Sequence, residues 1–151
     1  MMKLNSPAFG HEGKIPTQYT CDGENINPPL SILEAPGATQ SLVLLMEDPD
    51  VPKHLKEDGM WDHWVVFNIP PNLREILEGK EPEGTPGTGT NGEPGYYGPC
   101  PPDREHRYFF KLFALDTKLE LPEGATKAEV EKAMSGHILD ETHLMGRYER
   151  I

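Results

Sequence analysis

The sequence predicts a mostly β fold, a sandwich of short strands with long loops at one end and helices at its periphery. Of its 151 residues, 15 are glycine and 16 are proline, well above the roughly 12% that the two residues usually contribute together. Helices tolerate neither residue at this rate, so a helical bundle is excluded. Because 36% of the chain is hydrophobic, it can bury a core, and its length predicts one domain spanning residues 1–151.

Three dense apolar runs give the strongest strand signals. They cover residues 41–46, 64–69 and 107–115, and each is closed by an Asp, Pro or Gly signal. All three are rich in β-branched or aromatic residues, which is typical of buried strands. Residues 30–33 and 138–148 have a similar but weaker pattern, so we expect further strands there.

Two short amphipathic helices are also expected. The first begins at Asn72 and ends at a glycine, covering 72–79. The second covers 126–136, where Thr126 and Glu129 form the spacing of a capping box and a glycine again ends the helix. Both helices are predicted to cover a sheet rather than to form the core.

The charge of the chain narrows the classes of partner. It carries 14 Lys and Arg against 25 Asp and Glu, a formal net charge of −11, which disfavours nucleic acid and anionic membranes. No apolar stretch has the length of a signal peptide or a membrane span, so we expect no membrane insertion and a cytoplasmic protein. Cys21 and Cys100 lack C-x-x-C spacing and are expected to be free thiols in that compartment, although a disulfide between them is left open.

A long loop rich in glycine and proline separates two of the strong strands. Between residues 79 and 102, 13 of 24 residues are Gly or Pro. Long loops inside a compact domain are usually functional when they are ordered. The segment 87–92 matches G-x-G-x-x-G, but it lacks the strand and helix that a dinucleotide site needs, and we therefore expect no cofactor.

Polar side chains gather where the apolar strands begin or end. The acidic turn 47–52 follows the first strong strand and is stiffened by two prolines. Alternation along a strand places Trp61 and His63 on one face of the next strand, and His106 and Tyr108 share a face of the third. The acidic turn and the starts of these two strands together predict a small pocket at one end of the sandwich.

These segments resemble one known family. The patterns D-P-D-x-P at 48–52, W-x-H-W at 61–64 and G-P-C-P-P-x-x-x-H-R-Y at 98–108 closely resemble those of the phosphatidylethanolamine-binding protein family. They are similar in particular to its prokaryotic, Raf-kinase-inhibitor-like branch. Similar segments near both ends extend the resemblance over nearly the whole chain.

The resemblance implies a sandwich of two antiparallel sheets with two or three short peripheral helices and a small anion-binding pocket. It implies no metal. Eukaryotic relatives have glycine where Cys100 stands, and a helix beside their pocket has no counterpart here, so a more open pocket is expected. The pocket residues implied by motif position are Asp48, Asp50, Pro52, Trp61, His63, Gly98, Cys100, Pro101, His106 and Tyr108.

Binding rather than catalysis is the function that the resemblance implies. The expected ligand is a small phosphate-like or carboxylate anion such as a phosphoethanolamine headgroup, with modulation of a kinase or protease as a further role and a homodimer left open. Two aspartates would repel such a ligand, so we expect a protonated phosphate oxygen to meet a carboxylate. Imidazolium at His63 or His106 would supply donors, and affinity should then rise as pH falls through about 6.5.

The alternative is a hydrolase that uses the same pocket. Aspartates and histidines are plausible zinc or iron ligands, although no H-x-H or H-x-x-x-H pair is present. Cys100 beside His106 would be a plausible nucleophile, because a nearby imidazolium lowers the pKa of a thiol. A pocket-lining thiol without a catalytic role is the simpler interpretation.

Overall fold

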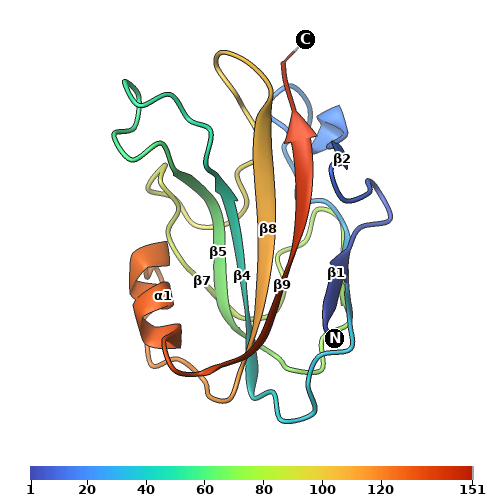
Figure 1. The fold of residues 1–151 in the computed structure, drawn as a ribbon, viewed down its shortest axis with the longest axis vertical. Helices are drawn as coiled ribbons and strands as arrows, with labels where there is room; N and C mark the ends of the chain where they lie inside the picture. The colour runs from blue at the N-terminus through green and yellow to red at the C-terminus, as the bar shows by residue number, and fades with distance from the viewer. Residues whose placement is uncertain (151) are drawn as a thin grey trace.

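Two β-sheets of unequal size make up the fold of the computed structural model, which describes residues 1–150. Figure 1 shows the larger sheet running along the long axis, with one helix against its outer face. Within the described residues the strands are β1 (Lys3–Asn5), β2 (Gly13–Lys14), β3 (Leu30–Leu33), β4 (Ser41–Asp48), β5 (Trp61–Ile69), β6 (Glu75–Ile76), β7 (Thr85–Pro86), β8 (His106–Leu115) and β9 (Ile138–Tyr148). The helices are η1 (Thr17–Tyr19), a single 3-10 turn, and α1 (Lys127–Met134).

The mostly β fold with two sheets is confirmed. The larger sheet has the order β2-β9-β8-β4-β5-β7 and the smaller one the order β1-β3-β6. The three apolar runs that gave the strongest signals became β4, β5 and β8, which are neighbours within the larger sheet. One pair departs from the expected antiparallel pattern, since β2 runs parallel to β9.

Strand β4 is buried on both faces and joins two hydrophobic clusters. Leu42, Leu44 and Met46 face the smaller sheet, whereas Val43 and Leu45 face α1. This division follows from the two-residue period of a strand. Burying one such side chain contributes about 1.5–3 kcal/mol, so the centre of the larger sheet is a rigid base for the loops at its ends.

Helix α1 forms as the capping pattern predicted. The Thr126 hydroxyl accepts a hydrogen bond from the Glu129 amide at 3.2 Å, and the Glu129 carboxylate accepts one from the Thr126 amide at 3.0 Å. Val130 and Met134 are buried against the sheet. Within residues 1–150 no helix combines the length and the apolar content needed to cross a membrane.

The predicted helix over 72–79 is wrong. That segment contains the short strand β6, which pairs with β3 so that Ile76 lies opposite Leu30. Ile76 is buried, whereas Leu77, which the helix would have turned inward, is 54% exposed. Pairing with an open strand edge satisfies more backbone groups than one isolated helical turn, and this long-range gain outweighed the local capping signal.

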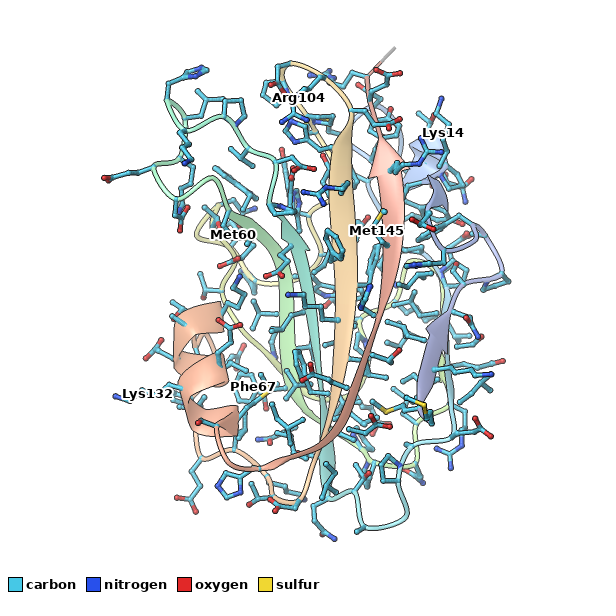
Figure 2. The ribbon with its side chains drawn as sticks, in the orientation of Figure 1. Lys14, Met60, Phe67, Arg104, Lys132 and Met145 are labelled. Atoms are coloured by element: carbon cyan, nitrogen blue, oxygen red, sulfur yellow. A yellow bond between two sulfur atoms is a disulfide. The ribbon has the colours of Figure 1, made fainter. Side chains whose placement is uncertain are left out.

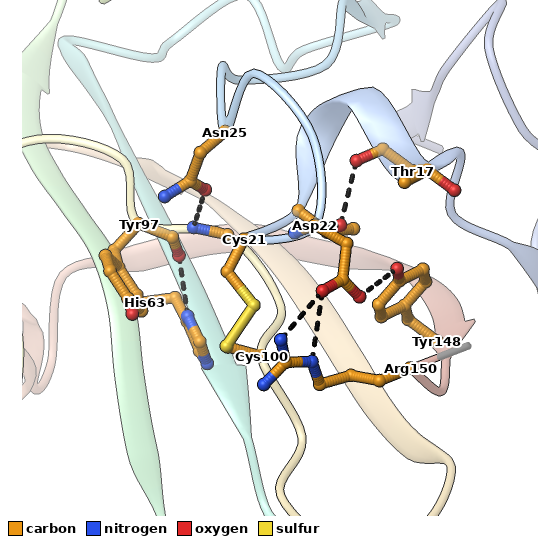
Figure 3. The surroundings of a disulfide bond; sticks show 11 residues. Thr17, Cys21, Asp22, Asn25, His63, Tyr97, Cys100, Tyr148 and Arg150 are labelled. Carbon is orange, nitrogen blue, oxygen red and sulfur yellow. Dashed lines mark hydrogen bonds and ion pairs between the residues drawn. A yellow bond between two sulfur atoms is a disulfide. The ribbon is translucent and has the colours of Figure 1, made fainter.

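The expectation of free thiols is also wrong. Cys21 and Cys100 form a disulfide across 79 residues of chain. Figure 3 shows that this bond joins the loop after η1 to the loop before β8. The expected cytoplasmic location rested partly on free thiols. It has lost that support and stays a prediction.

Candidate functional site

A cavity of about 250 Å³ opens at the end of the larger sheet where β4 ends and where β5 and β8 begin. The antiparallel register places Asp48, the last residue of β4, opposite Trp61, the first residue of β5. The loops 49–60 and 99–105 lie at this same end in Figure 1, and Arg104 marks the second loop in Figure 2. The lining residues are Asp48, Val51, Leu55, Trp61, His63, Tyr97, Cys100, Pro102 and His106.

Two buried side chains, Asp48 and His106, form the polar floor of this cavity. The carboxylate Oδ2 of Asp48 lies 2.6 Å from Nδ1 of His106, and Oδ1 accepts a hydrogen bond from the amide of Asp50 at 2.8 Å. Burial raises the pKa of Asp48, although the hydrogen bonds from His106 and the Asp50 amide oppose the rise. The carboxyl of Asp48 therefore accepts a proton more readily than an exposed aspartate does.

His63 presents a free acceptor to the cavity. Its Nδ1 lies 2.6 Å from the carbonyl oxygen of Tyr97, drawn as a dashed line in Figure 3. A carbonyl can only accept, so Nδ1 carries the proton and Nε2 of the neutral ring keeps its lone pair. Burial lowers the pKa of His63 to about 4. At neutral pH this residue is an acceptor, contrary to the expectation that its imidazolium form supplies a donor.

Tyr108 lies behind the two histidines rather than in the cavity wall. Its ring stacks on His106 with centroids 6.4 Å apart and meets the His63 ring edge-on at 5.4 Å. Burial and the nearby negative charge of Asp48 raise the pKa of its hydroxyl, which has no hydrogen-bond partner within residues 1–150. Tyr108 fixes the two imidazole rings by packing and holds an unused donor next to the site.

The upper walls of the cavity are apolar. Val51 and Leu55 come from the loop after β4, Trp61 from β5, and Pro102 from the loop before β8. Leu55 is 55% exposed although it lines the cavity. A ligand would therefore meet polar groups at the floor and apolar surface near the mouth.

One wall of the cavity is held in place by the loop after η1. The amide of Gly98 donates to Oδ1 of Asn25 at 2.8 Å, and the amide of Cys21 donates to the carbonyl of Pro99 at 3.1 Å. A side chain at position 98 would bring its Cβ within 2.1 Å of the carbonyl oxygen of Tyr19. Only glycine allows the two loops to approach this closely.

Only some of the residues expected in the pocket line this cavity. Asp48, Trp61, His63, Cys100 and His106 line it. The other expected residues, Asp50, Pro52, Gly98, Pro101 and Tyr108, lie nearby without lining it, and Val51, Leu55, Tyr97 and Pro102 take their places.

Asp50 differs most from the expectation. Its carboxylate forms two hydrogen bonds with the guanidinium of Arg107, at 3.0 and 2.8 Å, and a third with the Arg107 amide. Arg107 is half exposed on the opposite face of β8 from His106. The hydrogen bond from Arg107 lowers the pKa of Asp50, so Asp50 orients the turn from outside the cavity.

Asp103 is the functional candidate that the sequence did not indicate. Its Oδ1 lies 2.7 Å from Nε2 of His106, on the side of the ring away from Asp48. Its position three residues before His106 was the one feature of the sequence that could have indicated this contact. In an irregular loop, however, such spacing does not show in which direction a side chain points.

The hydrolase alternative that depends on Cys100 loses its nucleophile. Cys100 is bonded to Cys21 and therefore offers no thiolate as a nucleophile. In the part of the chain that the structure describes, no three His, Cys, Asp or Glu side chains are arranged to hold a metal ion.

Comparison with known proteins identifies relatives over the full length. The family model described as "Phosphatidylethanolamine-binding protein" matches residues 5–149. A UPF0098 protein from Chlamydia pneumoniae is 49% identical over 149 residues, covering 99% of both chains. One from Methanothermobacter thermautotrophicus is 49% identical over 155 residues, with the same coverage.

Solved structures share the fold. A putative phosphatidylethanolamine-binding protein homologue from Chlamydia trachomatis superposes with a TM-score of 0.97 at 47% identity, covering 99% of this chain and 98% of the other. YbcL of E. coli, described as a member of the mammalian family, gives a TM-score of 0.89 at 26% identity, covering 99% of both chains. None of these names is that of an enzyme.

Proposed function

Because the chain belongs to the phosphatidylethanolamine-binding protein family, we propose that it binds a small protonated oxyanion, a phosphomonoester or a carboxylic acid, in the cavity above Asp48 and His106. The observation that carries this proposal is the free Nε2 of His63. The side chain is 96% buried, lines the cavity, and donates from its other nitrogen to Tyr97. A ligand that donates a proton to this acceptor satisfies it.

Charge limits the form in which an anion can enter. The cavity lining contains no lysine or arginine, and the Asp48 carboxyl at its floor is an acceptor when ionised. A fully deprotonated phosphate would meet two acceptors, whereas a singly protonated phosphate or a neutral carboxylic acid brings a hydroxyl to one of them. The cavity volume of about 250 Å³ accommodates such a head with a few carbon atoms against Val51 and Leu55.

The expected pH dependence then comes from the ligand rather than from a histidine. A phosphomonoester loses its second proton near pH 6, whereas the pKa of His63 is lowered by burial to about 4. Affinity should therefore rise as pH falls through about 6. A sulfate ester stays fully deprotonated over this range and should bind far more weakly.

Isothermal calorimetry with phosphoethanolamine, methyl phosphate and methyl sulfate between pH 5 and 8 tests the proposal. The variant His63→Leu should lower phosphate affinity, whereas His143→Leu, which removes an exposed histidine from the outer face of β9, should not. Equal binding of methyl sulfate, or a phosphate affinity that does not change with pH, would contradict the proposed recognition. Modulation of a kinase or protease stays a prediction from the sequence.

A further inference from the structure

Asp103 lies outside the cavity, yet its side chain contacts the histidine at the cavity floor. Its Oδ1 is 2.7 Å from Nε2 of His106, while Nδ1 of the same ring is 2.6 Å from Oδ2 of Asp48. His106 is fully buried and Asp103 is 41% exposed. The imidazole ring therefore connects a carboxylate in the cavity with a carboxylate at the surface.

The charge of the His106 ring is linked to the number of its nitrogens that carry a proton. An ionised carboxylate only accepts hydrogen bonds, and an imidazole has an N–H on both nitrogens only when it is protonated. Desolvation by burial opposes ionisation of Asp103, but the hydrogen bonds from His106 and from the Arg104 amide, together with the neighbouring positive charge, lower the pKa of this carboxyl. Each nitrogen of the His106 ring lies within hydrogen-bond distance of a carboxylate oxygen, at 2.6 and 2.7 Å, so an imidazolium could donate to both.

The other groups around this ring bring no second positive charge into the cavity. His63 of β5 is neutral at pH 7, because burial, opposed by the hydrogen bond to Tyr97 and reinforced by the neighbouring His106, lowers its pKa to about 4. Tyr108 stacks on the ring, and Tyr148 of β9 lies opposite it in register. Arg104 is exposed and lies 3.8 Å from Oδ2 of Asp103.

We propose that Asp103 is a positioning residue for anion binding, because it keeps His106 in the imidazolium form whose charge offsets Asp48 at the cavity floor. The proposal rests on the proposed function. Without Asp103, a neutral His106 that donates only from Nδ1 satisfies Asp48 just as well. The Asp48–His106 pair would then change from neutral to a net charge of −1 inside the cavity, which repels an incoming anion, whereas the negative charge removed with Asp103 lies outside the cavity lining and is 41% exposed.

The test compares Asp103→Asn, which removes the charge, with Asp103→Glu, which keeps it. The matched control is Asp116→Asn, because Asp116 pairs with His137 at 2.8 Å in an exposed Asp–His pair outside the cavity lining. Two quantities are measured on each folded protein. The first is the protonation of both ring nitrogens of His106 at pH 7, from nitrogen-15 NMR, and the second is the dissociation constant of methyl phosphate at pH 6, from calorimetry.

We expect both nitrogens of His106 to be protonated in the wild type and in the Glu variant, and only one in the Asn variant. Affinity should fall by about tenfold or more in the Asn variant, and it should be unchanged in Asp116→Asn. A wild-type His106 with one unprotonated nitrogen at pH 7 would overturn the proposal even if the Asn variant failed to fold. An Asn variant that binds methyl phosphate as the wild type does would also overturn it. If the wild type bound no phosphate probe, the proposed function would fail, whereas the NMR measurement would still report on Asp103.

Discussion

Removing the disulfide between Cys21 and Cys100 should destabilise the protein mainly through its unfolded state. The bond closes a loop over a sequence separation of 79 residues. Closing a loop of this length removes conformational entropy from the unfolded chain, and this raises the free energy of unfolding by about 4.5 kcal/mol at 25 °C. This value is near the upper end of what disulfides contribute, because the closed loop spans more than half of the chain.

The folded state should change little when the bond is removed. The loops that it joins are also connected by the hydrogen bond from the Cys21 amide to the Pro99 carbonyl and by the bond from the Gly98 amide to Asn25. The hydroxyl of Tyr96 adds a third, to the carbonyl of Tyr19. These contacts keep the cavity wall in place after reduction.

Urea unfolding of the oxidised protein, of the reduced protein and of the double variant Cys21→Ser, Cys100→Ser measures this effect. The oxidised protein should be more stable by about 3–4.5 kcal/mol, and the affinity for phosphoethanolamine should change by less than about threefold. Thiol titration in denaturant should detect no free thiol before reduction. The reasoning would be refuted if the oxidised and reduced proteins unfolded within about 1 kcal/mol of each other, or if two thiols titrated without reductant.

Three further changes test separate parts of the structure. Gly98→Ala should destabilise the protein by more than about 2 kcal/mol and weaken phosphate binding, because the new Cβ would lie 2.1 Å from the carbonyl oxygen of Tyr19; an unchanged urea midpoint would contradict this. Between pH 6.5 and 4 stability should fall as pH falls, because unfolded His63 takes up a proton near pH 6.5 and the folded residue only near its lowered pKa of about 4. The loss should reach at most about 3 kcal/mol, and urea melts of His63→Gln should lack it. Thr126→Ala should cost about 1 kcal/mol by removing the cap of α1 and should leave calorimetric affinity unchanged; a loss of affinity would show that α1 acts on the cavity.

Features that depend on neighbours in the sequence were predictable. The runs 41–46, 64–69 and 107–115 became buried strands, because residues rich in β-branched and aromatic side chains favour strands over helices. Helix α1 formed where Thr126 and Glu129 satisfy each other's backbone groups, a contact that lies within one turn. The alternation of side chains along β5 and β8 likewise placed His63 and His106 on faces that meet at the cavity.

Features that depend on distant parts of the chain were not predictable in the same way. Segment 72–79 looked helical by itself, but the open edge of β3 paired with Ile76 instead. Cys21 and Cys100 met because two loops converge, which their spacing alone does not reveal.

The sequence by itself therefore determined the fold class, the family and several of the residues that line the cavity, because patterning and capping act over a few residues. Only the tertiary structure decided how those residues are charged. Burial makes His63 a neutral acceptor, Arg107 draws Asp50 away from the cavity, and Asp103 reaches His106 from the surface. Each of these outcomes depends on desolvation and on partners brought together by folding, and the linear order of residues contains neither.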